Sequence, residues 1–138
     1  MRIVADTNVL VSAAASPRGV AARVLVLAAE GRVRLFVSPF ILSELEEVLG
    51  RPKIGFTRDK IRASLDAAEE VAEIVHPKVK VNIIAAEDSD NRILECAIEA
   101  RADVLVTGNM RDIRPLGTVQ GIEILTPREF LDKYFPDL

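Results

Sequence analysis

The stretches Arg2-Ile3-Val4-Ala5-Asp6 and Asp103-Val104-Leu105-Val106-Thr107 decide the fold of this sequence. Each contains a short apolar run without alternation, and each run stops at polar residues. Runs of this kind are typical of strands that are buried in a parallel sheet. We therefore predict parallel strands over 2–5 and 103–106, with Asp6 and Thr107 at their carboxyl ends. Functional residues of open parallel sheets gather at that edge.

Helical and strand patterns alternate along the rest of the chain. Further strands are predicted over 33–37 and 122–125. Apolar residues at helical spacing predict helices over 20–30, 39–50, 57–75, 91–100 and 127–134. Three of these helices follow residues that typically cap a helix start, namely Ser38, Thr57 and Thr126. The segment 79–86 shows neither a clear helical nor a clear strand pattern, and a short strand is one alternative there.

Strands that alternate with helices specify one architecture. A crossover between parallel strands needs a covering helix, so the sheet should carry helices on both faces. The chain has 138 residues, of which 49% are hydrophobic and 28% are charged, and this is the size and composition of one globular domain. We predict the α/β class, with a Rossmann-like, mostly parallel sheet in a single domain over 1–138.

Composition excludes several classes of protein. No apolar run reaches the roughly 20 residues that a membrane span needs, and the acid Asp6 comes too early for a signal peptide. We therefore expect a cytoplasmic protein. The single cysteine, Cys96, and the single histidine, His76, cannot form an internal disulfide or a Cys/His zinc site. The net charge of −3 argues against broad adhesion to nucleic acid but permits a basic rim around an acidic centre.

Acidic residues lie next to several predicted elements. Asp6 closes the first strand, Asp90 lies where a helix begins, and Asp112 follows the strand that ends at Val106. Glu44 lies beside the apolar stripe of a helix and can point toward the same crevice. Carboxylates that share a partly desolvated crevice repel one another unless a cation neutralises them. Mg²⁺ or Mn²⁺ prefers such oxygen ligands and suits the hydrolysis of phosphodiesters.

Each acid also has a structural interpretation. Asp6 can be a turn residue, Asp88 and Asp90 can cap a helix, and Asp112 can be an exposed loop acid. Glu44 shares its helix with other acidic residues and can belong to a solvated face. Spacing alone therefore leaves both interpretations open.

Four sequence blocks, taken in order, resemble those of the PIN-domain nucleases. The blocks are RIVADTNVLVS (2–12), VSPFILSEL (37–45), EDSDN (87–91) and ADVLVTGN (102–109). A further run, ILTPREF (124–130), is similar to the toxin components of toxin–antitoxin modules, which are relatives of the VapC ribonucleases. The resemblance covers essentially the whole chain. An isolated Asp-Thr-Asn is a weak signal, whereas the ordered set of four blocks is specific.

The resemblance implies a PIN-like fold, a metal site and a reaction. Asp6 matches the first acid of the family, Glu44 the acid on the helix, and Asp90 the acid that opens the helix before the Thr-Gly strand. In the family these acids bind Mg²⁺ or Mn²⁺, and the enzyme is an endoribonuclease that cuts single-stranded RNA. The partner implied by the resemblance is a cognate antitoxin protein.

The fourth acid departs from the commonest family pattern. Many relatives have Asp directly after Thr-Gly, where this sequence has Asn109, while others have Asn there and an Asp three positions on, which Asp112 matches. Asp112 is therefore assigned as the fourth catalytic and metal-binding acid. The resemblance implies that Asn8, Thr107 and Asn109 orient a carboxylate or a water, and that Asp88 is an outer acid.

The remaining candidate residues are less specific. Arg18, Arg111 and Arg114 can contact RNA phosphate, although ordinary basic surface residues look the same in sequence. Cys96 lies on an apolar helix face and is interpreted as a small core residue. His76 precedes a proline and is interpreted as a solvated helix end. The sequence leaves open whether two chains form a homodimer.

Two other functions stay open at this point. The first is a PIN-like fold that has lost catalysis and binds RNA or protein. Asn109, which stands where many relatives have Asp, keeps this function open. A measurement of metal binding distinguishes it from the nuclease. A phosphatase or phosphoacceptor domain with Asp6 as nucleophile fits less well. Asn8 stands where such a phosphatase has a second Asp, and no glycine-rich phosphate loop follows any predicted strand.

Overall fold

The computed structural model describes residues 1–84 and 87–138. These residues form a six-stranded sheet with the strand order β3-β2-β1-β4-β6-β5. Every neighbouring pair is parallel except β5 with β6, which is antiparallel. The strands are β1 (Arg2–Ala5), β2 (Arg34–Val37), β3 (Ala72–Ile74), β4 (Val104–Val106), β5 (Thr118–Val119) and β6 (Ile122–Leu125). The predicted α/β class and mostly parallel sheet are confirmed.

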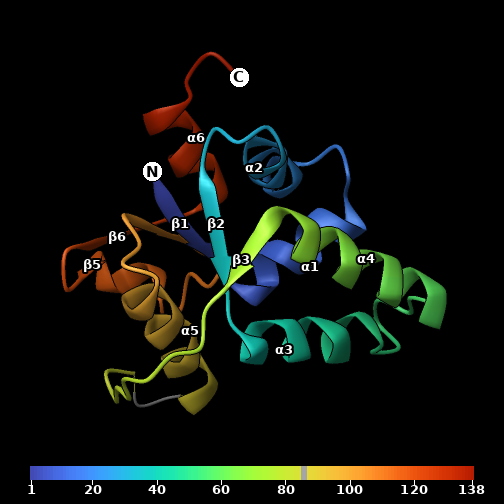
Figure 1. Ribbon diagram of the computed structural model, residues 1–138, viewed down its shortest axis with the longest axis horizontal. Helices are drawn as coiled ribbons and strands as arrows, with labels where there is room; N and C mark the ends of the chain where they lie inside the picture. The colour runs from blue at the N-terminus through green and yellow to red at the C-terminus, as the bar shows by residue number, and fades with distance from the viewer. Residues whose placement is uncertain (85–86) are drawn as a thin grey trace.

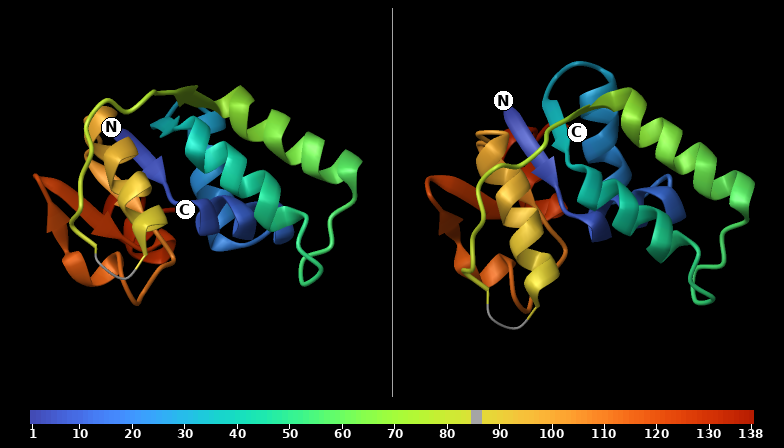
Figure 2. Two further views of the ribbon diagram at one scale, coloured as in Figure 1. Left: turned by 90° about the horizontal axis from the view of Figure 1, so that it is seen from below. Right: turned by 60° about the horizontal axis from the view of Figure 1, so that its bottom comes forward.

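Helices cover both faces of this sheet, as Figures 1 and 2 show. On one face α5 packs against β1 and β2. On the other, α1 packs on α2 and α3, α3 packs on α4, and α6 packs on α2. The helices are α1 (Thr7–Ala15), α2 (Val20–Ala29), α3 (Pro39–Leu49), α4 (Arg58–Val71), α5 (Asp88–Glu99) and α6 (Pro127–Tyr134), with a short 3₁₀ helix at Arg114–Leu116.

Local sequence signals explain where several helices begin. The Ser38 side chain accepts a hydrogen bond from the Ile41 backbone N–H at 3.2 Å, and proline occupies the first turn of α3. At α6, Thr126 and Glu129 form the predicted capping box. The Thr57 side chain caps α4 by accepting a hydrogen bond from the Lys60 backbone N–H at 3.2 Å. These helix starts were predicted correctly because the capping contacts are local in sequence.

The structure corrects the end of the helix that was predicted over 57–75. Helix α4 ends at Val71, and Ala72–Ile74 pair with β2 as the edge strand β3. Arg34 and Glu73 form an ion pair of 2.7 Å across these strands. The helical spacing continues past Val71 in the sequence, but pairing with a distant strand overrides it. Residues 79–84 form no strand, and the end of the segment 79–86, at 85–86, lies outside the described residues.

Helix α1 was not predicted. It begins directly after β1, with Asp6 in the N-cap position in an extended conformation. The Asp6 side chain makes no capping hydrogen bond, so its carboxylate faces other partners. The short strand β5 and the 3₁₀ helix were also missed, because elements this short carry little periodic signal.

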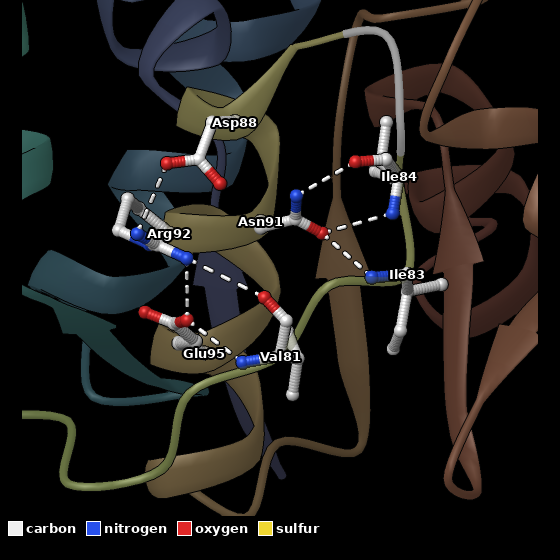
Figure 3. Close-up of polar contacts among 7 residues, drawn as sticks. All are labelled: Val81, Ile83, Ile84, Asp88, Asn91, Arg92 and Glu95. Carbon is white, nitrogen blue, oxygen red and sulfur yellow. Dashed lines mark hydrogen bonds and ion pairs between the residues drawn. The ribbon is translucent and has the colours of Figure 1, made fainter.

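A segment without regular structure, here called the strap (residues 75–84), connects β3 toward α5. Figure 2 shows the strap running beside α5, and Figure 3 shows the contacts between them. Three α5 side chains spaced four residues apart accept hydrogen bonds from strap backbone N–H groups. The bonds run from Lys78 to Glu99 (2.7 Å), from Val81 to Glu95 (2.9 Å), and from Ile83 and Ile84 to Asn91 (3.0 and 2.9 Å). The strap is therefore tied to α5 along most of its length.

No single described helix is long and apolar enough to cross a membrane. Helices α1 and α2 reach that length and composition only as a pair, and the pair is bent by 99°. Both helices contribute buried residues to the core of this domain.

Candidate metal centre

A cavity of about 260 Å³ lies at the carboxyl end of β1. Three carboxylates from three separate segments line it: Asp6 after β1, Glu44 on α3, and Asp90 in the first turn of α5. The other lining residues are Thr7, Asn8, Val11, Val48, Arg51 and Asn109. The fold thus brings together three of the four acids that the sequence singled out, at the edge of the sheet where they were expected.

Asp6 is the most deeply buried of these acids, with 5% of its surface exposed. The Thr107 hydroxyl donates to Asp6 Oδ2 at 2.7 Å, and the Asn8 amide approaches the same oxygen at 3.4 Å. Burial raises the pKa of Asp6 to about 6, and the negative charges of Asp90 and Glu44 add to this rise, while the Thr107 hydrogen bond opposes it. The structure therefore holds an acid whose charge is poorly compensated by the protein itself.

Asn8 joins the ends of the two central strands. Its side-chain oxygen accepts a hydrogen bond from the Gly108 backbone N–H at 2.9 Å. A Cβ atom at position 108 would lie 3.2 Å from that oxygen, which is tighter than ordinary contact. Glycine after Thr107 therefore lets the loop after β4 approach the loop after β1, and this approach positions both Asn8 and Thr107 around Asp6.

Asp90 is partly exposed and lies in the first turn of α5. Burial is the largest cause that raises its pKa, followed by the negative charges of Asp112, Glu87 and Glu44. The capping interpretation of Asp88 and Asp90 is wrong, because α5 begins at Asp88 and its N-cap residue is Glu87. Asp90 is therefore a second carboxylate whose charged form the protein disfavours.

Asn109 orients Asp90 in this structure. Its side-chain oxygen accepts hydrogen bonds from the backbone N–H groups of Arg111 (3.2 Å) and Asp112 (2.9 Å). These two donors fix which end of the amide is oxygen. The amide nitrogen consequently faces Asp90 and lies 3.4 Å from both carboxylate oxygens. The oxygen of Asn109 is already engaged by the loop, and the supporting role of Asn109 stays a prediction.

The other predicted site residues lie around the cavity without lining it. Asp112 contributes a negative charge that raises the pKa of Asp90. Thr107 is buried behind Asp6. Asp88 is 78% exposed at its side chain and pairs with Arg92 at 3.3 Å. The roles of Asp112 as fourth acid and of Asp88 as outer acid stay predictions.

The donor set fits a hard divalent cation. The ligand atoms available in the cavity are oxygens, which Mg²⁺ and Mn²⁺ prefer. Thr7 also lines the cavity, and its hydroxyl is buried without a hydrogen-bond partner among the described residues. Within the described ranges, no three acidic, cysteine or histidine side chains lie close enough to ligate one ion together. A hard cation that keeps several waters needs only one or two carboxylates bound directly.

Two of the sequence-predicted candidates have structural roles here. Arg114 forms two hydrogen bonds with Glu129, of 2.8 and 2.9 Å. These bonds hold the pKa of Glu129 down at about 2, the capping hydrogen bond at Thr126 adding to the effect. Cys96 is fully buried, and burial raises the pKa of its thiol to about 12, which confirms the core interpretation. Arg18, Arg111 and His76 are exposed.

Sequence reasoning missed two polar cavity residues, Thr7 and Arg51. Thr7 gives no distinctive signal, because a threonine after a strand is common. Arg51 lies seven positions after Glu44, and Val48 lies four after it, so all three fall on one face of α3 and its extension. Helical periodicity counted from Glu44 could therefore have identified Arg51.

The Asn109→Asp substitution tests the arrangement at Asp90. It places a carboxylate within about 3.4 Å of Asp90, so we expect a lower melting temperature without metal, since like charges at this distance repel. With Mn²⁺ the added ligand charge should raise the affinity roughly tenfold. Calorimetric titration with Mn²⁺, together with thermal unfolding in EDTA, measures both effects. Unchanged affinity and stability would mean that position 109 does not face the site.

Comparison with known proteins identifies the family. A profile of the PIN domain matches residues 2–111. An uncharacterized protein of Methanocaldococcus jannaschii is 29% identical in an alignment that covers 97% of this chain and 92% of the relative. A chain in the crystal structure of VapBC2 from Rickettsia felis bound to a promoter DNA fragment superposes with a TM-score of 0.64 at 20% identity, over 90% of this chain and 97% of that chain. At such identity the structural likeness supports the fold alone. The profile match, which spans most of the sequence and includes the segments that carry Asp6, Glu44, Asp90 and Asn109, shows that this chain belongs to the PIN domain family.

Proposed function

We propose that this protein is a Mg²⁺- or Mn²⁺-dependent endoribonuclease that hydrolyses phosphodiester bonds of single-stranded RNA. The observation that carries the proposal is the convergence of Asp6, Glu44 and Asp90 on one cavity. Here the raised pKa of Asp6 and of Asp90 indicates that the protein leaves their charge uncompensated.

The chain's own residues supply binding and orientation. Asp6, Glu44 and Asp90 would hold a hydrated cation without all three binding it directly, and the cation when bound would supply a Lewis acid that polarises the phosphoryl group and favours ionisation of water. Thr107 keeps Asp6 Oδ2 in place through its 2.7 Å hydrogen bond. The amide nitrogen of Asn109 lies 3.4 Å from the Asp90 carboxylate. The amide oxygen of Asn109 is itself fixed by two backbone N–H groups. The site is therefore preorganised before any ligand binds.

We further propose that the protein is the toxin of a toxin–antitoxin module. Three observations support this: the similarity of the 124–130 run to such toxins, membership of the PIN family, and the shared fold with a chain of a VapBC2 complex. The partner would then be a cognate antitoxin protein, and the place of action would be the cytoplasm, where messenger and transfer RNA are found. Growth arrest of a bacterial host by the wild type, but not by Asp6→Asn, tests the toxin role.

Metal dependence is the direct test of the nuclease. We expect Mn²⁺ or Mg²⁺ to raise the melting temperature and EDTA to reverse the rise, because a ligand at about 100 times its dissociation constant stabilises the fold by about 2.7 kcal/mol. RNA incubated with the wild type should be cut only when metal is present. No thermal shift at up to about ten millimolar metal, with RNA left intact, would favour a PIN fold that binds RNA or protein without catalysis.

A further inference from the structure

Arg51 has a position that neither the sequence motifs nor the proposed acids explain. It follows α3 and lines the same cavity as Asp6, Glu44 and Asp90. Among the described residues that line this cavity, Arg51 is the only one with a cationic side chain. An RNA phosphate that enters the cavity would therefore meet the cation of Arg51 together with the three acids.

The backbone at Arg51 is held by a turn. Its carbonyl oxygen accepts hydrogen bonds from the backbone N–H groups of Ile54 (3.0 Å) and Gly55 (2.7 Å), and its own N–H donates to Val48 (3.2 Å). Gly55 has a φ of +67°, which favours glycine. Pro52 further restricts the backbone of the residue before it. The base of the Arg51 side chain is thus fixed while its end is exposed.

The guanidinium group of Arg51 has an exchangeable partner. It donates to one carboxylate oxygen of Glu47, from Nη2 at 2.7 Å and from Nε at 3.3 Å. Both side chains are more than half exposed, and exposed pairs of this spacing are weak in water. Phosphate offers two oxygens to the planar donor fork of arginine, so it is a better match than a single carboxylate oxygen.

Two arginines near this edge of the sheet, Arg92 and Arg114, are engaged elsewhere, and the exposed Arg111 does not line the cavity. Arg114 is tied to Glu129 by two short hydrogen bonds. Arg92 is half-buried and bonds to Asp88 and Glu95 on its own helix. Neither of them lines the cavity. Arg51 therefore combines a place in the cavity with a donor group that can leave its present partner.

We infer that Arg51 is a phosphate-binding residue for the RNA substrate, which it reaches by exchanging Glu47 for a phosphate oxygen next to the metal centre. The inference rests on the proposed nuclease function for the identity of the ligand. In this role Arg51 binds the negatively charged phosphate of the substrate. The three acids cannot do this because they repel a phosphate.

The test measures binding of a labelled single-stranded RNA of about ten nucleotides to the Asp6→Asn protein, which should not cut it. Adding Arg51→Gln should weaken binding about tenfold at low salt and reduce the slope of log affinity against log salt by about 0.7, the value for one phosphate contact on a single strand. Glu47→Gln should tighten binding severalfold, because it removes the competing carboxylate.

A kinetic measurement on the active protein tests the same role. Arg51→Lys should raise KM more than it lowers kcat, since the positive charge remains but the planar donor fork of arginine is lost.

Arg62→Gln is the matched control. Arg62 pairs with Asp66 at the same four-residue spacing on α4, with similar exposure, but it does not line the cavity. Its loss should leave the salt slope unchanged. Equal effects at positions 51 and 62, or no effect at 51, would overturn the role of Arg51. A wild type that binds this RNA through Arg51 but never cuts it with Mn²⁺ would overturn the nuclease proposal alone, and a wild type that binds no RNA would overturn both.

Discussion

Replacing Asp6 by asparagine is expected to lower metal-dependent RNA cleavage by at least about a thousandfold and to stabilise the metal-free protein. The loss of activity follows because Asp6 would hold the cation at the carboxyl end of β1. The gain in stability follows because burial raises the pKa of Asp6 from 3.8 to about 6. A shift of this size disfavours the charged carboxylate in the fold by roughly 2 to 3 kcal/mol at neutral pH. Asparagine keeps the shape and can still accept from Thr107 without carrying the charge.

The raised pKa of Asp6 also determines in which direction the stability of the metal-free protein changes with pH. Because the folded pKa is the higher one, the folded state retains a proton at Asp6 that the unfolded state loses between pH 4 and pH 6. The free energy of unfolding of the metal-free wild type should therefore fall as the pH rises through this window. The Asp6→Asn protein lacks this contribution, so its advantage should be small near pH 4 and complete above about pH 6. Thermal unfolding in EDTA at several pH values measures the difference.

Metal should reverse which of the two proteins, the wild type or Asp6→Asn, is the more stable. Mn²⁺ is expected to stabilise the wild type strongly and Asp6→Asn only weakly, because the cation compensates the charge that destabilises the wild type. Asp103→Asn serves as a control, since Asp103 is an exposed acid that accepts from the Arg2 backbone N–H, away from the cavity. A marked drop in the metal-free melting temperature of Asp6→Asn would show that Asp6 is a structural acid, and the metal centre would then have to be placed elsewhere.

Replacing Asn91 by alanine is expected to destabilise the domain by about 3 to 5 kcal/mol. The Asn91 side chain is fully buried, and it accepts from the backbone N–H groups of Ile83 and Ile84 and donates to the Ile84 carbonyl at 2.7 Å (Figure 3). Alanine would leave these backbone groups without their partner, and each buried polar group left unpaired costs about 1 to 3 kcal/mol. Urea unfolding measures the loss, and hydrogen exchange at Ile83 and Ile84 locates it in the strap.

Glu99→Ala is the control for this prediction. Glu99 accepts from the Lys78 backbone N–H at 2.7 Å, but this contact is exposed, so water replaces it when the side chain is removed. We expect a loss below about 1 kcal/mol. Since Asn91 adjoins Asp90, Asn91→Ala should also weaken Mn²⁺ binding, whereas Glu99→Ala should not. Equal stability losses at the two positions would mean that burial of the strap contact does not decide its contribution.

Sequence patterns predicted those parts of the fold that depend on local chemistry. The strand at Arg2–Ala5 was found because it is continuously apolar, and the helix starts after Ser38 and Thr126 were found because their capping contacts lie within three residues. The helix α1 and the strand β3 were not found. In both cases a neighbour that is distant in sequence packs on the element: β2 pairs with Ala72–Ile74, and α3 packs on α1.

The sequence by itself determined the class of fold and the place of Asp6, because an apolar run fixes a buried strand and the residue after it lies at the edge of the sheet. It offered Glu44, Asp90 and Asp112 as candidates, which the family resemblance assigned to one site. Only the tertiary structure decided which acids share a cavity and what each polar neighbour does. It joined Asp6, Glu44 and Asp90, left Asp112 outside the cavity, and added Arg51. It also turned the amide nitrogen of Asn109 toward Asp90. Burial, the approach of distant charges and the competition for hydrogen-bond donors set these outcomes, and they depend on distances in space that the order of residues does not contain.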